Sequence, residues 1–183
     1  MNIDRQTGLL SGARFVNSPN QDDRHPGDEV NLLVIHNISL PPGQFAGGDI
    51  EAFFLNQLDS NKHPYYEKIS QLKVSCHLLI RRAGEMIQFV PFHKRAWHAG
   101  ESSFRGRTRC NDFSIGIELE GTDSESYTNI QYERLIECTQ VIRESYPKIS
   151  LDNIVGHCDI SPNRKTDPGP SFDWAYYRKG LPS

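Results

Sequence analysis

The sequence lacks the features that mark several classes of protein. Lys and Arg total 20 against 23 Asp and Glu, which gives a formal net charge of −3. A general nucleic-acid binder needs a concentrated basic surface for its phosphate contacts, so this balance argues against one. No apolar run is long enough to span a bilayer, and residues 1–16 hold no stretch typical of a signal peptide. We therefore expect a cytoplasmic protein that binds neither nucleic acid nor membrane.

Closely spaced cysteines are also missing, because the four cysteines form no pair and no C-x-x-C motif. Two disulfides are conceivable in a secreted protein, but without a signal segment the reduced state is the better prediction. Internal repeats, low-complexity tracts and interdomain linkers are absent as well. At 183 residues with 37% hydrophobic side chains, the chain is long enough to bury one core. We expect residues 1–183 to form a single monomeric domain.

Strand and helix patterns alternate along the chain, which predicts an α/β (mixed α+β) fold with a central mixed sheet flanked by helices. The apolar runs predict strands at 29–38, 113–119 and 153–157, and a hairpin formed by 74–80 and 85–90. The helical patterns predict helices at 49–58, 128–146 and 172–180. Asp49 is a plausible N-cap of the first helix, and Thr128 and Gln131 have the spacing of a capping box.

Three polar side chains come where predicted strands run out: His36, Glu118 and His157. Sites in such sheets gather at the carboxyl ends of strands, so these groups could converge. Two neutral imidazoles and a carboxylate would form a three-ligand zinc site with a fourth position for water. Asp167 is the natural third ligand, because it lies on the proline-stiffened loop of "HCDISPNRKTDPGP". Asp159 competes with it, although it is very near His157.

Ordinary structural roles compete with each of these assignments. A single histidine at a strand end is usually only hydrogen-bonded, and an aspartate in a Pro/Asn-rich loop is usually a turn-former. His77 lies between apolar residues, which favours a structural role. Lys165, two residues before Asp167, could stabilise an oxyanion, but a lone lysine on a loop is more often a surface residue.

Glu118 and Glu120 share one face of an extended segment. A carboxylate on the cleft face could act as general base and then as general acid. The alternative is the solvated face of an edge strand. The period-2 pattern cannot choose between the two glutamates.

The loop "HKRAWHAGESSFRGRTRC" (93–110) mixes aromatic and basic side chains against the acidic average. Its arginines suit carboxylates through the planar guanidinium, and Trp97 offers an apolar platform for a sugar or a peptide. A solvated loop with one anchoring Trp is the competing interpretation.

Four segments together resemble one family: "VIHNISLPPG", "HLLIRRAGEMIQFVPFHKRAWHAG", "RCNDFSIGIELEGTD" and "GHCDISPNRKTDPGPSFDW". They are similar to the cytoplasmic AmpD-type N-acetylmuramoyl-L-alanine amidases, and the likeness extends from about residue 10 to 178. Ala83 departs from the aspartate expected in the hairpin turn. In many wider relatives the third ligand is a cysteine, and the aspartate here fits the AmpD branch.

The resemblance implies a mixed sheet with flanking helices, one Zn²⁺ and an anhydromuramyl-peptide substrate, cut between the lactyl carbonyl and L-alanine. It implies metal ligands, catalytic groups and substrate contacts as follows: His36, His157 and Asp167 as ligands, Glu118 rather than Glu120 as the catalytic carboxylate, Lys165 in transition-state stabilisation, Tyr65 in support, and Asn37, Trp97 and Arg109 in the substrate groove. The rivals are a non-catalytic peptidoglycan-binding module and a domain in which the zinc is structural.

Overall fold

The computed structural model describes residues 1–182. Its strands are β1 (Arg14–Phe15), β2 (Gln21–Asp22), β3 (Leu32–Ile38), β4 (Leu78–Ile80), β5 (Met86–Gln88), β6 (Arg95–Ala96), β7 (Ser103–Phe104), β8 (Arg107–Thr108), β9 (Ser114–Glu120) and β10 (Ile154–Gly156). Its α-helices are α1 (Asp49–Phe54), α2 (Pro64–Ile69), α3 (Asn129–Ser145), α4 (His157–Ile160) and α5 (Trp174–Lys179). Short 3₁₀ turns occupy Ser60–Lys62, Cys110–Asp112 and Leu151–Asn153.

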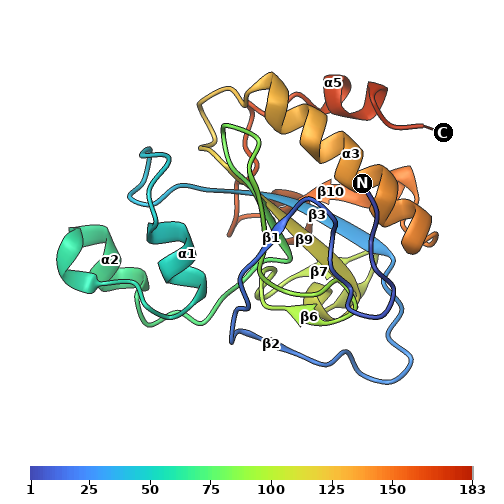
Figure 1. The fold of residues 1–183 in the computed structure, drawn as a ribbon, viewed down its shortest axis with the longest axis horizontal. Helices are drawn as coiled ribbons and strands as arrows, with labels where there is room; N and C mark the ends of the chain where they lie inside the picture. Colours follow the sequence, from blue (N-terminus) through green and yellow to red (C-terminus); the bar gives the residue numbers. More distant parts are fainter. Residues whose placement is uncertain (183) are drawn as a thin grey trace.

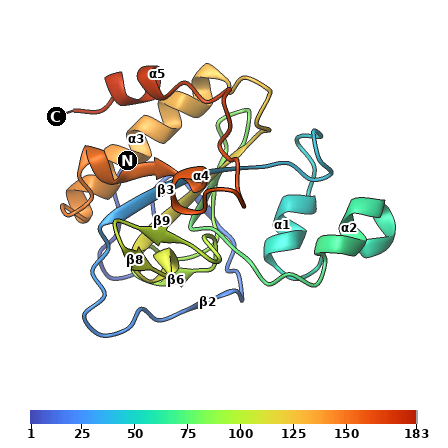
Figure 2. The ribbon, with the colours of Figure 1, turned by 180° about the vertical axis from the view of Figure 1, so that it is seen from behind.

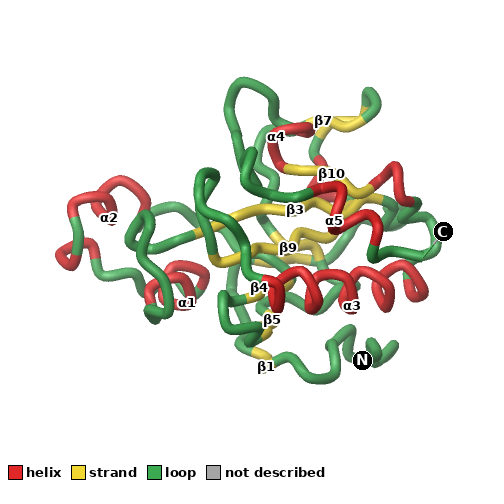
Figure 3. The backbone as a smooth tube through the Cα atoms, turned by 90° about the horizontal axis from the view of Figure 1, so that it is seen from above, coloured by secondary structure: helices red, strands yellow, loops and turns green. Residues whose placement is uncertain are grey.

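Six strands form one mixed sheet in the order β1-β5-β4-β9-β3-β10. The four strands from β4 to β10 are parallel to one another, and β4 and β5 form the antiparallel hairpin that the sequence predicts. Helices α3 and α5 lie together over one face, while α1 and α2 extend beyond one end of the sheet (Figure 1). The predicted α/β class with a mixed central sheet is confirmed (Figure 3).

The side chains of β3 point alternately to two faces of the sheet, and one of these faces carries His36. Leu33 and Ile35 pack in the cluster under α3, whereas Leu32 and Val34 pack on the opposite face beneath the 97–113 loop. Because side chains alternate along a strand, His36 lies on the same face as Leu32 and Val34. The strand therefore delivers a buried imidazole to the side of the sheet away from α3.

The capping box of α3 is confirmed: the Thr128 hydroxyl accepts a hydrogen bond from the Gln131 N–H, and the Gln131 side chain accepts one from the Thr128 N–H. At α1 two predictions are wrong. The helix ends at Phe54 rather than at residue 58, and Asp49 is its first residue while Gly48 holds the N-cap position. Asp49 instead accepts a hydrogen bond from the Tyr66 hydroxyl of α2, which ties the two helices together.

The last strand also ends earlier than predicted. β10 stops at Gly156, so His157 begins α4 instead of ending a strand (Figure 2). The Asp159 carboxylate accepts a hydrogen bond from the Gly156 N–H at 2.7 Å, which closes this helical turn. The 91–112 loop contains the short strands β6, β7 and β8, which short-range patterns did not reveal.

Two predicted absences can be compared with the structure. No helix within residues 1–182 is long and apolar enough to cross a membrane. All four cysteines are free thiols in the structure.

Candidate active site

Three predicted ligands converge where β3, α4 and the 161–170 loop meet. The Nδ1 atoms of His36 and His157 lie 2.9 Å apart, and each lies about 3 Å from Asp167 Oδ2, at 3.1 and 3.0 Å. Both histidines are buried, and Asp167 is half-buried. Two imidazole nitrogens and one carboxylate oxygen in this arrangement suit a divalent cation with N/O preference. The residues present therefore fit a metal ion.

The ionisation of these groups also fits a metal. Burial, with the His157 imidazole beside it, lowers the pKa of His36 to about 4, so at neutral pH the ring is uncharged and keeps a lone pair. Burial opposes ionisation of Asp167, but hydrogen bonds to His157 and His36 hold the pKa of this carboxyl below its ordinary value. His36 and Asp167 therefore present a neutral imidazole and an anion, the protonation that a metal requires of these two ligand types.

Glu118 lies beside His36 on the neighbouring strand, because the β3–β9 register pairs the two residues. Its side chain faces the cavity, only 9% of the residue is exposed, and within residues 1–182 its Oε2 atom has no hydrogen-bond partner. Burial raises the pKa of Glu118 well above its ordinary value, Asp167 raises it further, and Lys165 lowers it. A buried carboxylate with a free oxygen is suited to hold and release a proton.

Glu120, two residues further on the same face, has no such freedom. Its oxygens accept hydrogen bonds from Arg81 Nη1 at 3.0 Å, the Ala46 N–H at 2.8 Å and the Arg82 N–H at 3.2 Å. β9 lies between β4 and β3, so the alternative of an edge strand is excluded. The geometry thus separates two glutamates that the alternation pattern could not.

A cavity of about 660 Å³ surrounds these groups. Its apolar wall comes from α1, α2 and the segment that precedes β4, and includes Phe53, Ile69, Leu72 and Val74. Tyr65, which is 40% exposed, contributes an aromatic ring to the same wall. A pocket with one apolar wall and a few polar groups at its floor is the usual form of a small-ligand site.

Of the remaining predicted site residues, two line the cavity and two do not. Lys165 and Asn37 line the cavity, and the Asn37 amide donates to Asp123 Oδ1 and to the Pro168 carbonyl. Trp97 and Arg109 are not among the lining residues. The Arg109 side chain instead pairs with Asp112 at 3.1 Å. The substrate roles of Trp97 and Arg109 stay predictions.

Two residues near the ligands were missed by the sequence analysis. His98 Nδ1 lies 2.9 Å from His36 Nε2, and Arg164 donates to the Ala99 carbonyl at 2.7 Å. Both come from loops, where no periodicity marks an inward side chain. For His98 the signal was the second histidine of the 93–110 loop, which one sequence alone cannot assign to a partner 62 positions away.

The fold and the site agree with one family of enzymes. Residues 26–170 match the family described as N-acetylmuramoyl-L-alanine amidase (Amidase_2). The chain belongs to the N-acetylmuramoyl-L-alanine amidase family.

Within that family the chain is similar to one group over nearly its whole length. It is 58% identical over 171 residues to 1,6-anhydro-N-acetylmuramyl-L-alanine amidase AmpD of Citrobacter freundii, covering 93% of this chain and 91% of the relative. It is 56% identical to AmpD of Escherichia coli (strain K12), covering 94% of each. A crystal structure of a selenomethionine AmpD derivative superposes with a TM-score of 0.96 at 55% identity and covers 100% of both chains.

A more distant match includes a ligand. The complex of AmiD from E. coli with the substrate anhydro-N-acetylmuramic acid-L-Ala-D-γ-Glu-L-Lys has a TM-score of 0.61 at 31% identity. The alignment covers 84% of this chain and 58% of that one.

Proposed function

We propose that the protein hydrolyses the amide bond between the lactyl group of 1,6-anhydro-N-acetylmuramic acid and L-alanine of the stem peptide, in peptidoglycan recycling. The observation that carries this proposal is the convergence of His36, His157 and Asp167 beside the unpaired Glu118 oxygen, at the floor of the cavity. Family membership and the names of the near relatives support the choice of substrate.

The metal in this proposal is a single Zn²⁺ held by His36, His157 and Asp167. Histidine nitrogens and one carboxylate are ligands that catalytic zinc sites use, and no cysteine belongs to the group. Zinc at this position would polarise the lactyl carbonyl and lower the pKa of a water molecule.

The side chains around the metal site divide the remaining work. Glu118 receives a proton at its free Oε2 from the attacking water and delivers it to the departing alanine nitrogen. The Lys165 ammonium, which also lines the cavity, stabilises the negative charge that develops on the carbonyl oxygen. Glu118 is buried, so exclusion of bulk water strengthens its interaction, whereas Lys165 is exposed and acts from the solvent side.

Substrate contacts form the outer part of the proposal. Tyr65 lies on the apolar wall, where its ring can pack against the sugar or the peptide, and Asn37 also lines the cavity. Trp97 and Arg109 would extend the groove beyond the cavity, with Arg109 meeting a stem-peptide carboxylate. We also propose that the whole chain works as one monomeric domain in the cytoplasm, which light scattering and cell fractionation can test.

The proposal is tested by mass spectrometry of anhydromuramyl-tripeptide incubated with the purified protein. Free tripeptide should appear, stop on chelation and return when zinc is added. His157→Ala should abolish both zinc retention and cleavage, with His93→Ala, at an exposed loop position, as the matched control. Binding of the substrate without cleavage by zinc-loaded protein would favour the non-catalytic module. Unfolding on chelation without any hydrolysis would favour a structural zinc.

A further inference from the structure

The two metal-facing histidines are both held from behind by one dipeptide, His98–Ala99. His36 Nε2 lies 2.9 Å from His98 Nδ1, and His157 Nε2 lies 3.1 Å from the Ala99 carbonyl oxygen. A carbonyl oxygen only accepts hydrogen bonds, so His157 carries its proton on Nε2 and leaves the Nδ1 lone pair free. The same tautomer is needed at His36 if its Nδ1 is to bind a metal.

The direction of the His36 hydrogen bond depends on a third residue. His98 Nε2 lies 3.0 Å from the Ser114 hydroxyl, and both side chains are buried, with His98 9% exposed and Ser114 fully covered. When His98 donates from Nε2 to the Ser114 oxygen, its Nδ1 must accept, and His36 must donate from Nε2. The opposite direction would place the His36 proton on Nδ1, where it would block the metal.

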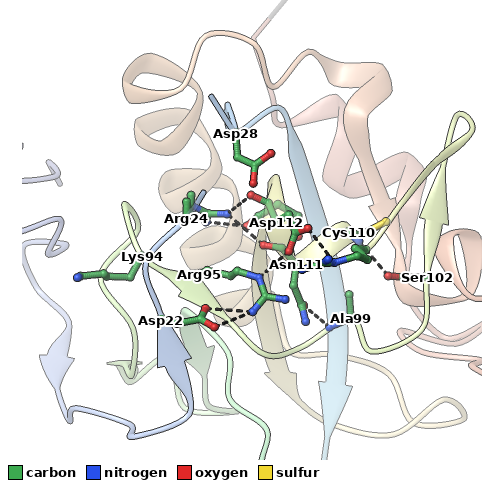
Figure 4. Close-up of polar contacts among 12 residues, drawn as sticks. Asp22, Arg24, Asp28, Lys94, Arg95, Ala99, Ser102, Cys110, Asn111 and Asp112 are labelled. Atoms are coloured by element: carbon green, nitrogen blue, oxygen red, sulfur yellow. Dashed lines mark hydrogen bonds and ion pairs between the residues drawn. The ribbon is translucent and has the colours of Figure 1, made fainter. Parts of the chain in front are cut away.

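Tight contacts keep the dipeptide in place. The Asn111 side-chain oxygen accepts hydrogen bonds from the His98 and Ala99 N–H groups at 3.0 and 2.8 Å, and Figure 4 shows the contact with Ala99. Arg24 donates to the Asn111 and Ser114 carbonyls, so it fixes the two backbone segments that hold the dipeptide. Beneath the ring lies Gly116, where an added Cβ would be only 2.5 Å from His98 atoms.

We propose that His98 is a positioning residue that fixes the metal-binding tautomer of His36, with Ser114 as its acceptor and Asn111 as the clamp on its backbone. The inference rests on the proposed function only in that His36 binds the metal. Partners behind metal-binding histidines commonly contribute 10- to 100-fold to metal affinity, roughly the effect expected here.

A matched pair of substitutions separates this role from simple packing. In His98→Asn the amide oxygen takes the place of Nδ1 and can still accept from His36. In His98→Gln the amide nitrogen takes the place of Nε2 and reaches only Ser114. The zinc dissociation constant, measured by chelator competition, should stay within about threefold of wild type for the Asn variant and weaken roughly 10- to 100-fold for the Gln variant.

Nitrogen-detected NMR of the zinc-free proteins gives a second readout. The His36 ring should show an Nε2–H in wild type and in His98→Asn, and a mixture of tautomers in His98→Gln. Equal zinc affinity of the two variants, or wild-type affinity of the Gln variant, would overturn the inference. Should neither variant fold, Ser114→Ala replaces them, and an unchanged affinity and tautomer in that variant would equally overturn it.

Hydrolysis is measured on the same samples, so the two proposals fail differently. If the two His98 variants show the expected zinc affinities but zinc-loaded wild-type protein does not cleave the muropeptide, only the proposed function is contradicted. Full cleavage combined with wild-type zinc affinity in His98→Gln contradicts the positioning role alone.

Discussion

Glu118 and Glu120 are the same side chain on the same face of one strand, two residues apart, yet their surroundings are opposite. Glu120 is enclosed by Arg81 and two backbone N–H groups, whereas Glu118 has a buried oxygen without a partner in the described chain. A buried polar group without a partner costs stability, so a fold retains one where function uses it. The comparison suggests that β9 carries one carboxylate for chemistry and one for structure.

Replacing Glu118 should have the largest effect on activity and little effect on folding. Glu118→Gln keeps the shape but removes the proton acceptor, so kcat for muropeptide cleavage should fall roughly 10²- to 10⁴-fold. Zinc content and the melting temperature should stay at wild-type values, because the substituted oxygen makes no hydrogen bond. Near-normal turnover in this variant would mean that another group moves the proton.

Replacing Glu120 should give the reverse pattern. In Glu120→Gln the buried Arg81 loses the charge of one partner, although Glu51 still accepts from it at 3.0 Å. Removal of one member of a buried pair costs about 3 kcal/mol in the free energy of unfolding, which urea titration can measure. At temperatures where the variant is folded, kcat should be unchanged. A stable but inactive protein would reverse the roles assigned to the two glutamates.

Buried histidines extend this comparison to the pH dependence of the free energy of unfolding. Burial lowers the pKa of His77 to about 3, and this ring accepts from the Gly116 N–H and donates to the Lys94 carbonyl, so it is as fully paired as Glu120. A folded-state pKa below the ordinary value means that the unfolded chain binds the proton first. The free energy of unfolding of zinc-free protein should therefore fall as the pH drops below about 6.5, by about 2 kcal/mol at pH 5 from His77 alone.

Urea titrations at pH 7 and pH 5 check this expectation. His36, whose pKa is lowered to about 4, adds to the slope in the zinc-free protein. Zinc should keep the His36 part and extend it to lower pH, because the metal holds that ring neutral in the folded protein while the unfolded chain still binds the proton. Equal stability at pH 7 and pH 5 without zinc would contradict the neutral, buried state of both rings.

Much of this architecture could be predicted because it depends on short-range patterns. The capping box placed the start of α3, and the apolar run placed β3 with His36 near its end. Alternation put Ile115, Ile117 and Leu119 on one face of β9, and all three lie in the core under α3. The three proposed ligands follow from strand ends and a proline-braced loop, which the structure brings together.

What could not be predicted depends on contacts between distant segments. Glu120 differs from Glu118 because Arg81 and the Ala46 N–H donate hydrogen bonds to it. Neither contact can be read from the pattern of the strand. His157 begins a helix because Asp159 caps the Gly156 N–H, which favours a turn over a longer strand. His98 acquires its place only when the loop folds across the sheet.

Gly116 shows how far such dependence extends. The residue touches no proposed ligand and carries no chemistry, yet its missing side chain is the space that the His98 ring occupies. A methyl group there would push the imidazole away from His36 and so loosen a metal site through a residue that no inspection of the ligands would name. In redesigned or natural variants, substitution of Gly116 in the middle of β9 is therefore expected to weaken metal binding even though every ligand is intact.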